Sequence, residues 1–162
     1  MMLEKGSRLI MAGDSVTDCQ RMREQAPCSW GSWGEGYVHV VYSRLLSEYP
    51  DKSIMVVNQG VSGDTSRDLL KRWDKDVMSL KPDYVSIMIG INDVWRYFDS
   101  VVRQESLVSK DEFRSNLREI VSKTKSSVKK IYFLTPVMFE INKTEPMFIM
   151  KKELFQILLN II

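Results

Sequence analysis

The segment RLIMAGDSVTD, residues 8–18, decides how the whole chain is interpreted. Its first part, Arg8–Ala12, has the apolar pattern of a buried strand. A glycine, an acid and a hydroxyl, Gly13, Asp14 and Ser15, stand directly where that strand should end. A sharp turn at this point would hold Ser15 at the edge of a sheet, on a loop positioned by a rigid scaffold. The rest of the sequence must supply its partners.

Further apolar segments repeat this strand pattern and alternate with amphipathic stretches. The alternation predicts a parallel sheet with helices on both faces, a three-layer α/β/α sandwich. The remaining strands are expected over 53–60, 84–90 and 129–136. The intervening helices are expected over 36–50, 65–80 and 109–124, the last one opening with a capping box of Ser109 and Glu112. The apolar face expected of the first helix comprises Val38, Val41, Tyr42, Leu45, Leu46 and Tyr49.

The bulk properties indicate a single globular domain over residues 1–162. The formal charge of +2 comes from scattered basic and acidic residues, which excludes a basic stripe for binding nucleic acid. No segment reaches the roughly 18 apolar residues of a membrane span, and no signal-peptide pattern is present. Cys19 and Cys28 are expected to be free thiols in a cytoplasmic protein; one disulfide closing their loop is the alternative.

Three polar turns follow the first three expected strands. The second turn, NQGVSGDT over 58–65, contains Gly60 and Gly63, and the third, GIND over 90–93, contains Asn92. Because the carboxyl ends of parallel strands lie at one edge of the sheet, the turns should converge. Acyl transfer needs a nucleophile and oxyanion donors. We expect Ser15 as the nucleophile, with the N–H groups of Ser15 and Gly60 and the amide of Asn92 as donors.

Each of these residues also has a plain structural interpretation. A serine after Gly-Asp often caps a turn or helix, a glycine such as Gly60 often ends a strand, and an asparagine such as Asn92 often stabilises a loop. Their order after successive strands favours a common site.

GDSVT, the Gly60 segment and GIND, in this order, resemble the first three motif blocks of the SGNH, or GDSL, hydrolases. The resemblance extends from about Leu3 to Met147. It implies a flavodoxin-like sandwich and the activity of an esterase, lipase or carbohydrate deacetylase. It also implies that Ser15 is the nucleophile, that Gly60 and Asn92 complete the oxyanion hole, and that no metal or organic cofactor is needed.

One part of the family pattern is missing. The family takes its catalytic base and orienting acid from a late Asp-x-x-His motif, whereas this chain has one histidine, His39, and no aspartate after Asp111. His39 is expected to be a structural or exposed residue on the flank of a helix, and Asp14 a structural one. We therefore expect a C-terminally incomplete domain without the last strand and helix, inactive or impaired as an enzyme.

Aromatic residues near the expected site each have a binding interpretation and a packing interpretation. Trp33 is expected either to form a wall of an acyl or sugar pocket or to pack over the end of the sheet. Trp95 and Arg96 follow GIND directly and either bind an anionic or sugar-like substrate or anchor their own loop. The substrate expected is a small acyl ester such as an acetylated sugar.

The apolar tail predicts self-association, because a missing fifth strand would leave an unpaired sheet edge. The residues expected in the contact of a homo-oligomer are Phe148, Leu154, Phe155, Leu158 and Ile161. The alternative to a hydrolase is a non-catalytic binding module that keeps the oxyanion pocket for a carboxylate or acylated ligand. A nucleotide binder is disfavoured, because GDSVT lacks the glycine density of a phosphate-binding loop.

Overall fold

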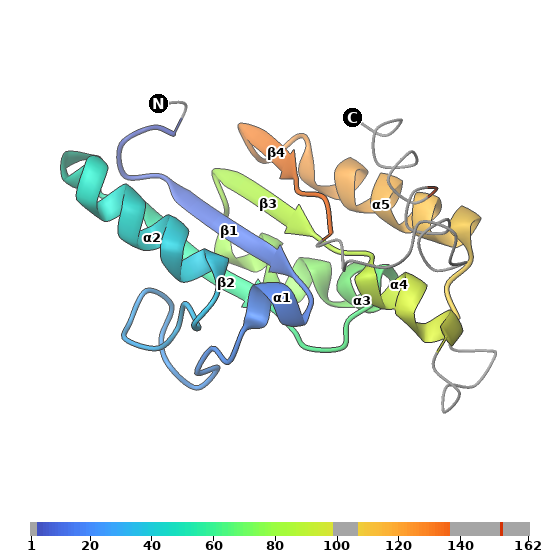
Figure 1. The fold of residues 1–162 in the computed structure, drawn as a ribbon. Helices are drawn as coiled ribbons and strands as arrows, with labels where there is room; N and C mark the ends of the chain where they lie inside the picture. The colour runs from blue at the N-terminus through green and yellow to red at the C-terminus, as the bar shows by residue number, and fades with distance from the viewer. Residues whose placement is uncertain (1–2, 99–106, 137–152, 154–162) are drawn as a thin grey trace.

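The chain folds around a central parallel sheet (Figure 1). The computed structural model describes residues 3–98, 107–136 and 153. The strands are β1 (Arg8–Gly13), β2 (Met55–Gly60), β3 (Tyr84–Met88) and β4 (Lys130–Phe133), and their order in the sheet is β2-β1-β3-β4. All four expected strands are confirmed, with ends that differ from the predicted ones by at most three residues.

Helices cover both faces of the sheet, so the predicted three layers are confirmed (Figure 1). The long helices are α2 (Tyr37–Glu48), α3 (Ser66–Asp76) and α5 (Lys110–Thr124), and the short ones that follow β1 and β3 directly are α1 (Ser15–Asp18) and α4 (Ile91–Trp95). Three 3₁₀ turns complete the described elements: η1 (Pro50–Lys52), η2 (Met78–Leu80) and η3 (Arg96–Phe98).

Alternate residues of β1 serve two hydrophobic cores, one on each face of the sheet. Leu9 and Met11 pack with residues of α2 such as Val38. Ile10 and Ala12 pack with residues of α3 and α5, of which Leu69, Trp73, Phe113 and Leu117 are fully buried. The period of two along the strand therefore explains why β1 is apolar throughout.

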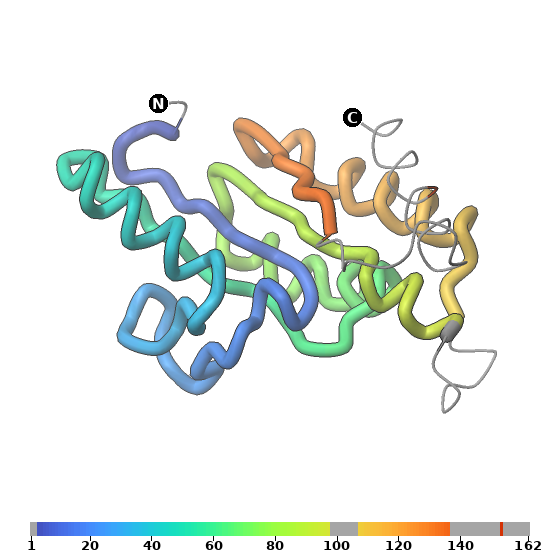
Figure 2. Tube along the Cα trace, viewed as in Figure 1, coloured from blue at the N-terminus to red at the C-terminus, as the bar shows by residue number. Residues whose placement is uncertain are grey.

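The direction in which successive strands are added to the sheet reverses at β1 (Figure 2). From β1 the chain passes through α2 to β2 on one side, and then through α3 back across the sheet to β3 on the other side. Open α/β sheets bind their ligands outside the carboxyl ends of the strands at such a switch point. The fold thus places the turns after β1 and β3 where a site is expected.

Local details of the helices differ from the prediction. Leu46 and Tyr49 are 55% and 39% exposed, so the apolar period of α2 continues beyond its contact with the core, which still includes Leu45. The helix expected over 65–80 ends at Asp76, because the backbone then changes to the tighter bonds of η2.

The capping box expected at the start of α5 forms only in part. Ser109 Oγ accepts a hydrogen bond of 3.2 Å from the backbone N–H of Glu112. The carboxylate of Glu112 instead pairs with Arg67 on α3, with a distance of 2.5 Å between Nε and Oε1. A complete capping box starts α3, formed by Thr65 and Asp68.

Three other expectations concern the cysteines, the apolar tail and membrane spans. Both cysteines are free thiols, as predicted. The tail residues expected in an oligomer contact lie outside the described residues. Within the described part of the chain, no helix has the length and apolar character needed to span a bilayer.

Candidate active site

Ser15 lies at the start of α1, immediately past the end of β1. A side chain on Gly13 would come within 2.2 Å of the carbonyl oxygen of Met88, so only glycine allows the close packing at this turn. Asp14 is buried and caps α1 by accepting a bond of 3.0 Å from the N–H of Val16. Ser15 itself is exposed. The turn predicted from the sequence therefore presents this hydroxyl at the sheet edge.

The backbone of Ser15 also offers a donor. The first N–H groups of a helix have no partner within the helix. No acceptor for the Ser15 N–H was found within the described ranges. The Ser15 N–H is therefore available as a donor beside the hydroxyl of the same residue, and its predicted role at an oxyanion stays a prediction.

Gly60 does not provide the donor expected of it. Its N–H donates a bond of 2.8 Å to Oδ1 of Asn58. A side chain on Gly60 would approach the backbone nitrogen of Asp18 to 2.1 Å, so this glycine packs beneath α1. Its N–H is therefore occupied inside the protein and does not face a substrate, which corrects the expectation.

The neighbouring Gly63 has the properties that Gly60 lacks. Its φ of +89° is in the region that favours glycine, and within the described ranges the one atom within 4 Å of an added side chain would be Nη2 of Arg96, at 3.5 Å. Among the described residues, no acceptor takes its N–H. The signal in the sequence was present in SGDT, where Gly63 stands two residues before Thr65, the N-cap of α3.

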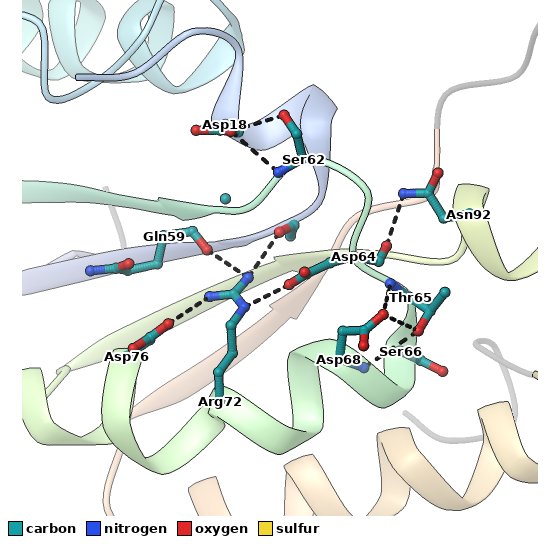
Figure 3. Close-up of polar contacts among 12 residues, drawn as sticks. Asp18, Gln59, Ser62, Asp64, Thr65, Ser66, Asp68, Arg72, Asp76 and Asn92 are labelled. Carbon is teal, nitrogen blue, oxygen red and sulfur yellow. Dashed lines mark hydrogen bonds and ion pairs between the residues drawn. The ribbon is translucent and has the colours of Figure 1, made fainter. Parts of the chain in front are cut away.

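Hydrogen bonds hold the loop that contains Gly63 against both neighbouring segments (Figure 3). Ser62 donates from its N–H (3.2 Å) and its hydroxyl (2.9 Å) to Oδ2 of Asp18 on α1. On the other side, Nδ2 of Asn92 donates a bond of 2.9 Å to the carbonyl oxygen of Asp64. The three turns therefore meet at one edge of the sheet, as predicted.

The residue after Asn92 continues this connection. Asp93 is 1% exposed and accepts bonds from the N–H (3.0 Å) and hydroxyl (2.6 Å) of Ser66, the first residue of α3. Asn116 on α5 donates to the same hydroxyl at 3.0 Å. Burial raises the pKa of Asp93 to about 6, against the opposing effect of the Ser66 bonds. Two adjacent residues of α4, Asn92 and Asp93, thus hold residues 64 and 66 in place through hydrogen bonds.

Asp14 also has an altered acidity. Burial raises the pKa of this carboxyl to about 6, and the charge of nearby Asp64 contributes in the same direction. Because its acceptor atom is engaged by Val16 N–H in the cap, Asp14 has the structural role that was expected.

The tryptophans separate into a core residue and a surface residue. Trp33 is 7% exposed, donates from Nε1 to the carbonyl of Val56 at 2.8 Å, and stacks on Tyr42 with ring centroids 3.8 Å apart. The structure thus favours the packing interpretation over a pocket wall. Trp95 on α4 is 46% exposed. Arg96 reaches the loop that contains Gly63, with Nη2 3.4 Å from the carbonyl oxygen of Gly63.

His39, the single histidine, lies on α2 and is exposed. Its ring stacks on that of Trp33, with centroids 6.3 Å apart. Within residues 3–98 and 107–136, no hydrogen bond joins a histidine or a carboxylate side chain to the hydroxyl of Ser15. His39 thus has the helix-flank, exposed position expected from the sequence.

Comparisons with known proteins agree with this geometry. Residues 11–152 match the GDSL-like lipase/acylhydrolase family. An acetylxylan esterase from Geobacillus stearothermophilus is 48% identical over 147 residues, which cover 91% of this chain and 67% of that protein.

Solved structures give the same result. The crystal structure of Axe2, an acetylxylan esterase from Geobacillus stearothermophilus, matches with a TM-score of 0.94 and 44% identity over 99% of this chain and 74% of that one. LAE5, an alpha/beta hydrolase from the metagenome of Lake Arreo, matches with a TM-score of 0.94 and 38% identity over 98% of this chain and 73% of its own. Catalytic mutants of Axe2 with alanine in place of an aspartate, a serine or a histidine match equally well. The fold and these matches together establish that the chain belongs to the GDSL-like lipase/acylhydrolase family.

Proposed function

We propose that this chain is a serine ester hydrolase that acts on acetylated carbohydrates through Ser15. The observation that carries the proposal is the hydrogen-bonded connection from Asp18 on α1 through Ser62 and Asp64 to Asn92 on α4. This connection supports a site at the switch point of the sheet, in which Ser15 would be the nucleophile and three N–H groups the oxyanion donors. The similarity to an acetylxylan esterase supports an acetylated sugar as the substrate class.

The proposed reaction is an acyl transfer in two steps. Ser15 Oγ attacks the carbonyl carbon of the acetyl ester and loses its proton, and the carbonyl oxygen becomes an oxyanion. The N–H groups of Ser15 and Gly63 and the second amide hydrogen of Asn92 stabilise that oxyanion. The sugar leaves with a proton as an alcohol, and water then attacks the acetyl-serine, which releases acetate and restores the hydroxyl.

Proton removal from Ser15 is the weak step of this chain. A neutral hydroxyl needs a base within hydrogen-bond distance. The one histidine of the sequence, His39, stacks on Trp33 instead. An enzyme without its base keeps only a rate enhancement of about 10³ to 10⁴ over water, from the oxyanion hole and substrate binding. We therefore propose that the 162-residue chain is a slow esterase.

The same observation supports a second candidate function. Among the described residues, no acceptor takes the N–H groups of Ser15 and Gly63, and no base is hydrogen-bonded to the Ser15 hydroxyl. Such a site can hold a carboxylate or an acylated ligand without turning it over. A non-catalytic binding module is therefore the alternative to a slow esterase.

One experiment separates the two functions. Hydrolysis of p-nitrophenyl acetate is measured for the wild-type chain and for Ser15→Ala, with increasing imidazole as an external base. A slow esterase shows a difference between the two proteins that grows with imidazole. Identical rates at every concentration, combined with saturable binding of acetate, would favour the binding module. Rapid stoichiometric labelling of Ser15 by a fluorophosphonate without imidazole would contradict the impairment.

We also propose a cytoplasmic location and self-association through the apolar tail. The free thiols of Cys19 and Cys28 support a reducing compartment. Light scattering at high dilution tests the second point, and a uniform monomer would contradict it.

A further inference from the structure

Arg72 on α3 is a largely buried guanidinium that the proposed reaction does not use (Figure 3). Its side chain is 14% exposed, and its Nε lies 2.6 Å from Oδ2 of Asp64. Nη2 donates to the carbonyl oxygens of Gly13, at 3.1 Å, and Gln59, at 3.0 Å. Nη1 is 3.5 Å from Oδ2 of Asp76. One side chain therefore binds acceptors from three different segments.

Two of these acceptors belong to opposite sides of the candidate site. Gly13 stands two residues before Ser15, at the end of β1, and Asp64 directly follows Gly63. The fork of an arginine side chain can bind several acceptors in a fixed plane at once. The guanidinium of Arg72 thus binds both the turn that leads to Ser15 and the loop that contains Gly63, and it fixes the position of one relative to the other.

The Gly63 N–H depends on its neighbours for its direction. Gly63 has a φ of +89°, and Nη2 of Arg96 lies 3.4 Å from its carbonyl oxygen. Further contacts act on the two neighbouring residues. On one side, Ser62 is held by Asp18. On the other side, Asp64 is held at its carbonyl oxygen by Asn92 and at its carboxylate by Arg72.

The charge of Arg72 suits this contact. Burial raises the pKa of Asp64, whereas the charge and hydrogen bond of Arg72 lower it. The pKa of Asp64 is raised overall, and the charge of Arg23 opposes this in the same way as Arg72 does. Arg72 is the group in direct contact with Asp64 that favours the ionised carboxylate, the form that accepts a short charge-assisted hydrogen bond.

We infer that Arg72 is a positioning residue, which holds the Gly63 N–H at the distance from Ser15 that the oxyanion requires. The inference rests on the proposed function. Displacing a reacting group by about 1 Å can lower a rate about 10²-fold, so a residue that touches no substrate can still control the reaction.

The test compares Arg72→Lys with a matched control on the same helix. Arg67→Lys alters another ion pair of α3, the one that Arg67 forms with Glu112 on α5. Circular dichroism and urea unfolding first establish that both variants fold. Acetylation of Ser15 by p-nitrophenyl acetate is then followed by intact-protein mass spectrometry at fixed imidazole, with Ser15→Ala as the blank.

The expected result is a loss of about 10- to 100-fold in the acetylation rate constant of Arg72→Lys, with no change in its apparent affinity for the ester. Arg67→Lys keeps the wild-type rate. Asp64→Asn removes the same ion pair from the other partner and should show a similar loss, and the double variant should lose no more than either single one. An equal loss in Arg67→Lys would overturn the inference.

A second readout does not require any reaction. In ¹⁵N-labelled protein, Arg72→Lys should shift the amide resonances of Gly63 and Ser15, and Arg67→Lys should not. Unchanged resonances in folded Arg72→Lys would overturn the inference even if the wild-type protein is inactive. Absent Ser15-dependent acetylation in the wild type, with the shifts present, would contradict only the proposed function. If Arg72→Lys does not fold, Asp64→Asn, which leaves the bonds of Arg72 to Gly13 and Gln59, supplies both measurements.

Discussion

Asn92 and Asp64 are joined by a hydrogen bond of 2.9 Å from the side-chain amide to the backbone carbonyl. The bond uses one of the two amide hydrogens of Asn92 and fixes the plane of the group. The second hydrogen is thereby oriented without a further ordering cost. The bond to Asp64 therefore orients the second N–H of Asn92, which is the donor to the oxyanion in the proposed reaction.

Replacing Asn92 by alanine removes both hydrogens. We expect the imidazole-assisted, Ser15-dependent hydrolysis of p-nitrophenyl acetate to fall about 10²- to 10³-fold. The free energy of unfolding should fall by only about 1 kcal/mol, because one hydrogen bond is lost from a half-buried group. A rate within twofold of the wild type would show that Asn92 is only a loop stabiliser.

The two glycines of the second turn should respond differently to alanine. Gly60→Ala places a methyl group 2.1 Å from the backbone nitrogen of Asp18, so α1 must move and the protein should be strongly destabilised. Gly63→Ala meets no backbone atom and incurs only the conformational cost of its positive φ, about 1 kcal/mol. The Gly63 variant should remain folded by circular dichroism, yet react more slowly at Ser15. The reverse pattern would restore Gly60 as the donor.

The acidity of Asp93 gives a prediction about stability. Its pKa is raised from 3.8 to about 6 in the folded protein, chiefly by burial. Between about pH 4 and 6 the folded state therefore keeps a proton that the unfolded chain has lost. The stability from this group is complete below about pH 4 and is lost as the pH rises through about 6.

Urea unfolding at several pH values tests this assignment with Asp93→Asn. The free energy of unfolding of the wild type, relative to that of Asp93→Asn, should fall by about 1.4 kcal/mol for each pH unit between about pH 4 and 6. It should be constant at higher pH. Asp111→Asn, at an exposed ion pair with Arg114, serves as the control and should run parallel to the wild type. A parallel course for Asp93→Asn would contradict the raised pKa.

Trp33 and Trp95 should differ in how much their replacement by alanine lowers the free energy of unfolding. Trp33→Ala removes a buried ring that stacks on Tyr42, so the free energy of unfolding should fall by about 3 to 5 kcal/mol. Trp95→Ala should change it by about 0.5 kcal/mol or less, because the ring is 46% exposed. Urea unfolding measures both, and equal effects would contradict the division between core and surface.

Trp95 is the better candidate for sugar contact. It stands three residues after Asn92 on α4, so both side chains lie on the same face of that helix. Calorimetry with a xylo-oligosaccharide should show about fivefold weaker binding for Trp95→Ala, corresponding to roughly 1 kcal/mol for one aromatic contact. Trp30→Ala is the matched control, since Trp30 is 83% exposed and lies in the segment between α1 and α2. Equal losses in both variants would contradict a specific role.

The sequence by itself determined the layered architecture and the edge of the sheet at which Ser15 and Asn92 lie. Strand patterns such as Arg8–Ala12 are local, and the carboxyl ends of parallel strands must meet at one edge. The capping by Asp14 is equally local, since its acceptor and donor are two residues apart.

Only the tertiary structure decided which glycine offers its N–H. Asn58 turns its oxygen toward Gly60 because its nitrogen donates to the carbonyls of Thr17 and Trp33, at 2.7 and 2.8 Å. These partners are 41 and 25 residues away along the chain, so no spacing in the sequence reveals them. Which acceptor a donor binds depends on the acceptors that the fold brings close to it. The periodicity of the sequence contains no information about those acceptors.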